Sequence, residues 1–159
     1  MAAFAEVIAE EPRFAARVRG CFDARRHKLL ATLRADGSPR ISGIEMSFVA
    51  DEPWLAGMPS SVKFADLRRD PRFALHSGSD EPDVWTADAK ISGRAGEVTE
   101  PAERASYAEA AGMPPGPLEF ELFRVELDLV VLTALNDEKS ALLISSWRPG
   151  RGLSTTERT

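Results

Sequence analysis

The sequence of 159 residues contains a single cysteine, Cys21, so no disulfide can form within the chain. Cys21 falls on the apolar side of a helical pattern, where we expect a buried and unreactive thiol. No stretch approaches the ~20 consecutive apolar residues of a membrane span, and the first residues are acidic and lack the apolar core of a secretory signal. These absences predict a cytoplasmic protein with no membrane partner.

An excess of positive charge is also missing. The chain has 20 lysines and arginines against 25 aspartates and glutamates, which gives a net charge of −5 at pH 7. Domains that bind nucleic acid through its phosphates are more often basic. The sequence therefore predicts no nucleic-acid partner, although an acidic total still leaves room for a local basic pocket.

The motifs of several enzyme classes do not occur. The sequence has no G-x-S-x-G, no H-E-x-x-H and no paired cysteines, and its two histidines, His27 and His76, lie far apart. A catalytic triad or a metal site is therefore not expected, and no residue stands out as a catalytic acid or base. Phosphate loops of the G-x-G-x-x-G or G-x-x-x-x-G-K-S kind are absent too.

Apolar spacing predicts helices at the beginning of the chain. Between Phe4 and Phe22 the apolar residues recur at intervals of three, four and seven, which is typical of an amphipathic helix. Proline suits the first turn of a helix, so the segment 1–26 should hold two helical pieces that meet near Pro12. Two further helices are predicted, at 62–69 and from 100 to about 112.

The rest of the chain has the pattern of short strands joined by tight turns. Asp36-Gly37 between two apolar runs marks a hairpin, and Ser42-Gly43 interrupts the alternation of the next run, which predicts a bulge. The segment 114–117 is too rich in proline to be helical, and the polar residues 148–159 predict a mobile tail. The predicted strands are 28–34, 39–49, 54–58, 73–77, 85–98, 123–135 and 141–147.

Six or seven short strands with few helices predict a mainly β fold, a small barrel that is closed or partly closed. We expect one domain that spans residues 1–159. The run Val130-Val131-Leu132 is apolar on both faces of its strand. A small barrel covers only one of these faces, so the other needs a partner, which gives dimerisation a physical basis.

Three segments are candidates for a binding site. In the first, Ser60, Ser61 and Lys63 stand at the start of a helix that follows a strand ending at Met58. The N-terminus of a helix has free N–H groups and the positive end of the helix dipole, so it suits a phosphate. The alternative is a serine N-cap with a surface lysine, which these residues taken alone favour.

The other two segments have residues that suit a flat ring. A glycine such as Gly43 inside a strand lets a ring approach the backbone, and Arg40 can supply charge. Trp147, at the end of the last predicted strand, can cover a ring. The alternatives are an outward-pointing arginine with a glycine at a barrel corner, and a tryptophan that seals the open end of the barrel.

Taken in order, these residues resemble the pyridoxamine 5′-phosphate oxidase-like split β-barrel family. The segment 31–40 (Ala-Thr-Leu-Arg-Ala-Asp-Gly-Ser-Pro-Arg) is similar to the opening hairpin of the family. Ser61-Val62-Lys63 and the segment 67–73 are similar to its phosphate helix and the strand after it. Residues 146–152 resemble the C-terminus of actinobacterial members, and the similarity extends from about Phe4 to Arg158.

The resemblance implies a six-stranded antiparallel split β-barrel and a homodimer with two flavin sites at its interface. Members bind FMN, and a related branch binds a deazaflavin, coenzyme F-420. By this resemblance Ser61 and Lys63 hold the phosphate, and Arg40, Ile41, Ser42 and Gly43 run beside the isoalloxazine ring. Trp147 and Arg148 come near the ring from the same or the partner subunit, and Met58 and Ser60 complete the expected set.

The sequence departs from the vitamin oxidases of this family at several cations. Val62 stands where those enzymes have an arginine before the phosphate lysine, and the strand after the hairpin lacks their arginine and lysine. The resemblance therefore predicts an FMN-dependent oxidoreductase, or alternatively an F-420-dependent reductase, that acts on another small-molecule substrate. A second possibility, which the missing cations favour, is a non-catalytic module that binds flavin or heme.

Overall fold

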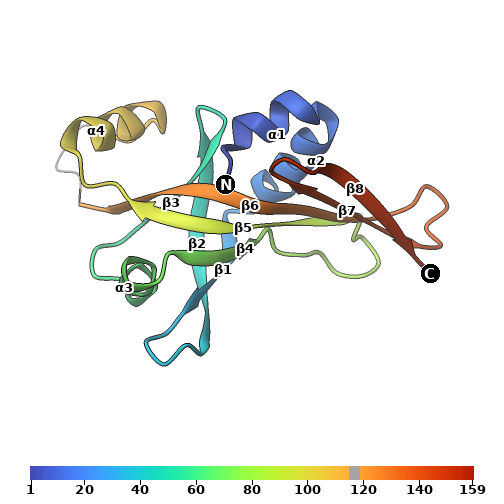
Figure 1. Cartoon of the computed structure of the whole chain (residues 1–159), viewed down its shortest axis with the longest axis horizontal. Coiled ribbons are helices and arrows are strands. Elements are labelled where there is room, and N and C mark those ends of the chain that lie inside the picture. Colours follow the sequence, from blue (N-terminus) through green and yellow to red (C-terminus); the bar gives the residue numbers. More distant parts are fainter. Residues whose placement is uncertain (115–118) are drawn as a thin grey trace.

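The computed structural model describes residues 1–114 and 119–159 of the chain (Figure 1). Its helices are α1 (Phe4–Glu10), α2 (Pro12–Asp23), α3 (Val62–Arg69) and α4 (Pro101–Ala110). Its strands are β1 (His27–Leu33), β2 (Pro39–Val49), β3 (Glu52–Gly57), β4 (Arg72–His76), β5 (Ala87–Glu97), β6 (Glu121–Leu135), β7 (Leu142–Arg148) and β8 (Gly152–Arg158). Over the described residues, no helix is both long and apolar enough to cross a membrane.

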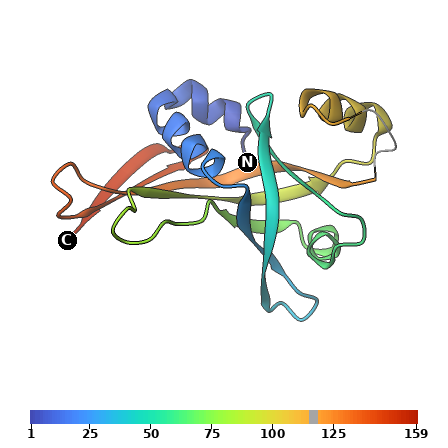
Figure 2. The ribbon, with the colours of Figure 1, turned by 180° about the vertical axis from the view of Figure 1, so that it is seen from behind.

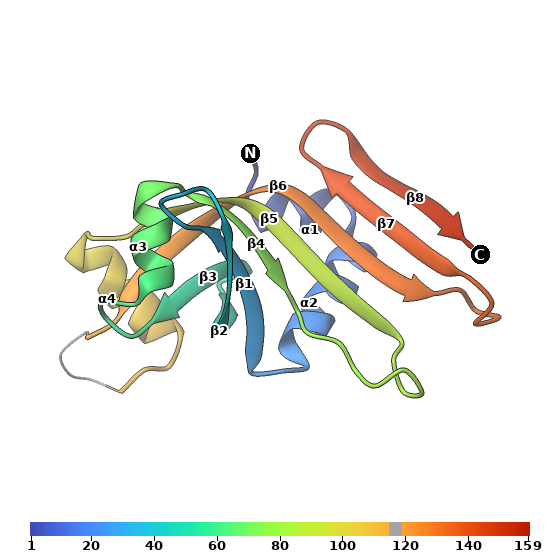
Figure 3. The same ribbon diagram turned by 90° about the horizontal axis from the view of Figure 1, so that it is seen from below.

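Six of the strands close into an antiparallel barrel. The order of the sheet is β3-β2-β1-β4-β5-β6-β7-β8, and an additional pairing of β3 with β6 joins the two ends of the six-stranded part. Beyond β6 the sheet continues as the β7–β8 hairpin, which projects from the barrel (Figure 3). The prediction of a mainly β, six-stranded antiparallel split barrel is therefore confirmed.

Period-two alternation decides which side chains fill this barrel. On β2, Ile44 and Met46 are buried, whereas Glu45 and Ser47 between and beside them are exposed. Helices α1 and α2 lie against one side of the sheet (Figure 2), and their apolar faces join the same core. The fully buried residues that the two helices supply are Phe4, Val7, Val18 and Phe22.

The predicted break between the two N-terminal helices is confirmed. Pro12 is the first residue of α2, where its fixed φ is already helical and its missing N–H costs no hydrogen bond. Helix α1 is fastened to the barrel at its start, because the carboxylate of Glu52 on β3 accepts the N–H groups of Phe4 and Ala5 at 2.8 and 3.0 Å. Helix α1 is thus held to the barrel at its N-terminal end.

The prediction of a mobile C-terminal tail is wrong for most of that segment. Residues 152–158 form β8, which pairs with the whole of β7 from Leu142 to Arg148. β8 is a polar edge strand rich in serine and threonine, so it lacks the apolar alternation by which the other strands are recognised. Its hydroxyls bond across the ladder, as between Ser145 and Thr155 at 2.9 Å.

Two local predictions along the strands are also wrong. β2 pairs with β1 from Pro39 to Glu45 without a register shift, so Ser42-Gly43 forms no bulge. The turn between β2 and β3 lies at Ala50-Asp51, both with positive φ, and β3 begins at Glu52, two residues before the predicted start of that strand at Trp54. The predicted non-helical segment 114–117 falls mostly outside the described residues.

Gly93 is the position at which the sheet leaves no room for a side chain. A Cβ on Gly93 would lie 1.9 Å from the carbonyl oxygen of Glu126 on β6. The register between β5 and β6 shifts at the same place, between Ser92 and Gly93. Gly96, on the same strand, has no atom within 4 Å of a Cβ built on it.

This difference gives a matched pair of variants. We expect Gly93→Ala to lower the free energy of unfolding by about 1–3 kcal/mol or more, because the backbone of β6 must move to admit the methyl group. Gly96→Ala should change it by less than about 0.5 kcal/mol. Urea denaturation of both variants measures the difference, and equal stabilities would contradict the close approach of β5 and β6.

Candidate functional site

Helix α3 begins with free hydrogen-bond donors. Ser61 is its N-cap residue, as predicted, but the Ser61 hydroxyl donates backward to the carbonyl of Met58 at 2.7 Å and does not cap the helix. Among the described residues, the N–H groups of Val62 and Lys63 have no acceptor. The first turn of α3 therefore offers two amide donors and the positive end of the helix dipole beside the Lys63 ammonium.

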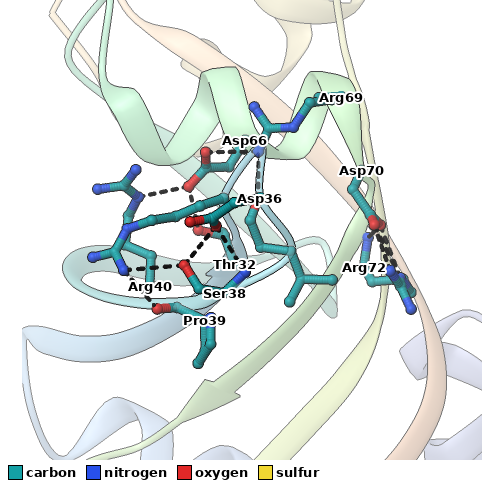
Figure 4. A network of polar contacts seen from close by, with 11 residues as sticks. Thr32, Asp36, Ser38, Pro39, Arg40, Asp66, Arg69, Asp70 and Arg72 are labelled. Atoms are coloured by element: carbon teal, nitrogen blue, oxygen red, sulfur yellow. Dashed lines mark hydrogen bonds and ion pairs between the residues drawn. The ribbon is translucent and has the colours of Figure 1, made fainter.

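A buried carboxylate fastens α3 to the β1–β2 hairpin. Asp66 of α3 accepts hydrogen bonds from Thr32 on β1 at 2.9 Å, from Arg40 on β2 at 2.6 Å and from Arg69 at 2.9 Å (Figure 4). Its side chain is 4% exposed. Burial by itself raises the pKa of Asp66, but these three hydrogen bonds outweigh it and lower the pKa to about 2.

This network changes the role expected of Arg40. The Arg40 guanidinium forms an ion pair with Asp66 and is only partly exposed, so the charge of Arg40 is already paired within the protein. Charge-assisted hydrogen bonds of this kind are among the strongest in proteins. Arg40 therefore acts here as a tie between β2 and α3, and it does not line the cleft described next.

A cleft of about 840 Å³ opens beside the start of α3. Its floor is the outward face of β2 and β3, including Gly43, Glu45, Ser47 and Ala56. On one side it is bordered by α4 and the segment after it. The lining residues there are Tyr107, Met113, Glu119 and Phe120, and those at the opposite end are Asp23, Arg25, Arg26, His27 and Lys28.

Three of the ten residues predicted for the site line this cleft together: Gly43, Met58 and Lys63. Ser61 lies next to them at the start of α3, and Ser60 is exposed in the turn before it, with a positive φ of 63°. Ile41 and Ser42 precede Gly43 on β2 but do not line the cleft, and Ile41 is 74% exposed. Arg148 is exposed at the turn between β7 and β8.

Trp147 is a core residue rather than a contact for a ring. Its side chain is completely buried, and its indole N–H donates to Glu10 at the end of α1 at 2.7 Å. A side chain with no exposed surface has no face left for a ligand. The structure thus places Trp147 in the core beside α1, on β7 beyond the six-stranded barrel, and corrects the expectation that it covers a cofactor.

An aromatic group with one hydroxyl forms the α4 wall of the cleft. Tyr107 packs against Trp54 and Phe120 with ring centroids 5.3 and 5.9 Å apart. Burial raises the pKa of Tyr107, and a hydrogen bond with Ser47 partly offsets this. The wall is therefore apolar and rigid, with the Tyr107–Ser47 pair as its polar feature.

Sequence reasoning missed the cleft residues outside β2 and α3. Tyr107 and Phe120 have no motif, and they meet only because α4 folds back over β3 and β6. Lys28 carried a usable signal, because it alternates with Leu30 and Thr32 and shares their buried face of β1.

The comparisons with known proteins agree on one family. The model of the family described as pyridoxamine 5′-phosphate oxidase matches residues 14–133. PhzG from Burkholderia lata 383, in complex with tetrahydrophenazine-1-carboxylic acid, aligns with a TM-score of 0.66 at 18% identity over 98% of this chain and 95% of PhzG. A search of curated protein sequences finds no match.

Two further solved structures share the fold. A pyridoxamine 5′-phosphate oxidase-related, FMN-binding protein from Nostoc punctiforme aligns with a TM-score of 0.62 at 14% identity, over 91% of this chain and 94% of that protein. Rv2991 from Mycobacterium tuberculosis aligns with a TM-score of 0.55 at 23% identity, over 70% and 79%. At these identities the likeness shows the fold.

The Asp66 network makes stability depend on pH. The pKa of Asp66 is lower in the folded protein than its ordinary value, so its contribution is present above about pH 4 and is lost as the pH falls toward 2. We expect Asp66→Asn to lower the free energy of unfolding at pH 7 by on the order of 2 kcal/mol. The difference from the original protein should shrink steadily between pH 4 and pH 2.

Asp128→Asn is the matched control, because Asp128 is exposed on β6. This variant should follow the original protein at every pH. Chemical denaturation at a series of pH values measures both variants, and an Asp66→Asn effect that stays constant down to pH 2 would rule out the ion network.

Proposed function

This chain belongs to the pyridoxamine 5′-phosphate oxidase family, and we propose that its cleft binds FMN and that the protein is an oxidoreductase for a small substrate. One observation carries the proposal. Lys63, which stands beside the two free amide donors at the start of α3, shares one cleft with Gly43, an open glycine in its floor. The first arrangement suits a phosphate and the second a flat ring.

The residues present fit a flavin. The volume of about 840 Å³ lies in the range of pockets that hold cofactors and drug-sized ligands. A Cβ built on Gly43 meets no protein atom within 4 Å, so the fold does not require glycine there and the space above it is free. Lys63 has no carboxylate within 4.0 Å among the described residues, so its charge is available to a phosphate.

Each residue then has a defined task. Lys63 and the N–H groups of Val62 and Lys63 bind the phosphate, while Gly43 lets the ring lie close to β2. Tyr107 and Phe120 exclude water from one side of the cleft and leave the other side open to a substrate. The flavin, when bound, supplies the hydride and electron transfer. Within this proposal no side chain of the chain is assigned as a catalytic acid or base.

Two alternatives keep the same site. The FMN-binding protein of Nostoc punctiforme supports FMN as the first choice, and coenzyme F-420 is the alternative because its ring would need the same open floor. A non-catalytic module that carries flavin or heme is the second alternative. Turnover separates it from an enzyme: cofactor-loaded protein that neither NAD(P)H nor reduced F-420 can reduce would favour the module.

We propose that the protein is a homodimer in the cytoplasm. Outward-facing residues of five strands stand in one row across the sheet, because Gly43 pairs with Leu29, Leu29 with His76, His76 with Lys90, and Lys90 with Val131. Leu29 is 50% exposed and Ile41 nearby 74%, so this face is partly apolar and uncovered. A partner on this face would reach the edge of the cleft at Gly43, which supports cofactor sites at the interface.

The phosphate contact is tested by comparing FMN with riboflavin, which lacks the phosphate. We expect the protein to bind FMN at least about tenfold more tightly than riboflavin, since a charged hydrogen bond contributes roughly 1.5–3 kcal/mol. Lys63→Met should remove most of this preference and leave riboflavin affinity unchanged. Flavin fluorescence titration measures both affinities.

Lys139→Met is the control for that experiment, because Lys139 is an exposed lysine in the turn between β6 and β7, outside the cleft and outside the proposed dimer face. Its preference for FMN should equal that of the original protein.

Gly43→Val tests the place of the ring. The thermal stability of this variant should be retained, whereas its affinity for FMN and its affinity for riboflavin should fall together. A Gly43→Val protein that binds both ligands normally would contradict the proposed place of the ring.

The dimer is tested by light scattering at micromolar concentration. We expect a mass of twice the 17.4 kDa of one chain. Leu29→Glu should give a monomer, because it places a charge in the apolar face. Val84→Glu changes a residue that is 62% exposed in a loop outside the sheet, so this control should remain dimeric. A monomeric original protein would contradict the shared site.

A further inference from the structure

Lys28 is a buried lysine in the wall of the same cleft, at the end away from α3. Its side chain lies on β1 opposite Ile44, and the residue is only 5% exposed. Its ammonium donates to the carbonyl of Arg26 at 3.2 Å. Among the described residues, no carboxylate lies within 4.0 Å of it, and two of its three N–H groups have no acceptor.

The other basic side chains that line the cleft beside Lys28 already have a carboxylate neighbour. Arg25 bonds Asp80, and Arg26 and His27 both lie beside Glu45 at 3.0 and 3.6 Å. Burial lowers the pKa of Lys28, and the negative charges of Asp23 and Glu45 only partly offset this. Lys28 is thus the cation here that gains most from a new negative partner.

A buried charge without a counter-ion lowers the stability of a folded protein, and an apolar residue of similar size would avoid that cost. Positions at which a chain breaks this rule are often functional sites. Lys28 on β1 and Lys63 on α3, the helix that follows β3, both line the cleft on opposite sides of β2, and neither has an ion-pair partner among the described residues. The cleft is therefore built to accept negative charge at two separate places.

We propose that Lys28 binds the carboxylate of an organic substrate. The inference rests on the proposed function, in which the cofactor phosphate takes the Lys63 end and leaves the Lys28 end to the second ligand. A carboxylate fits better than a phosphate, because Asp23 and Glu45 lie close enough to repel a second negative charge. Met58, Met113 and Phe120 also line the cleft and suit an apolar body.

The experiment compares three carboxylates of increasing size, acetate, benzoate and 1-naphthoate, each with its primary amide. Isothermal titration of the FMN-loaded protein should show at least one carboxylate bound about tenfold or more tightly than its amide. Lys28→Met should abolish this preference. Lys139→Met, the exposed-lysine control, should retain it. No preference in any pair, or a preference that survives in Lys28→Met, overturns the proposal.

Two further measurements distinguish a failure of the Lys28 proposal from a failure of the cofactor assignment. The melting temperature of Lys28→Met should equal or exceed that of the original protein, because an unpaired buried charge is removed; a marked fall would show that Lys28 has a structural role and overturn the proposal. The titrations are repeated without flavin and in Lys63→Met. A carboxylate preference that persists there while FMN fails to bind supports the Lys28 subsite and refutes the cofactor assignment alone.

Discussion

The hydrogen bonds around Asp66 are the constraint on which the candidate site depends. Gly43 lies on strand β2, whereas Lys63 lies on helix α3, which is not part of the sheet. Arg40 on β2 and Thr32 on β1 both bond the carboxylate of Asp66 on α3, so helix and hairpin are held in one fixed relation. Arg69 adds a second cation to the same carboxylate, which offsets the cost of burying it.

The charges of the cleft follow from this arrangement. Arg40, the cation of β2, is paired with Asp66, so the unpaired positive charge of the cleft comes from Lys28 and Lys63. Tyr107, Phe120 and exposed methionines give the cleft its apolar part. An elongated ligand pair with negative groups at its outer ends and flat rings toward the middle is complementary to this distribution of charge and surface.

Sequence alone predicts the features that local chemistry determines. Gly37 has the positive φ that its hairpin turn requires, and Pro12 begins a helix as its fixed φ favours. Contacts between distant residues were not predictable in this way. Arg40 and Asp66 are 26 positions apart, and the indole of Trp147 bonds Glu10 across 137 positions, so only the folded chain shows that one cation is paired and that one ring is buried. β8 was not predicted, because a polar edge strand lacks the apolar alternation by which strands are recognised in a sequence.

The most direct test of the account is the visible absorption spectrum of the protein purified from its native host, followed by mass spectrometry of the small molecule that denaturation releases. The account predicts a stoichiometric flavin: two absorption bands and the mass of FMN, or the single band of a deazaflavin and the mass of coenzyme F-420. A colourless protein that releases neither compound, and that binds neither when they are added at micromolar concentration, would contradict it.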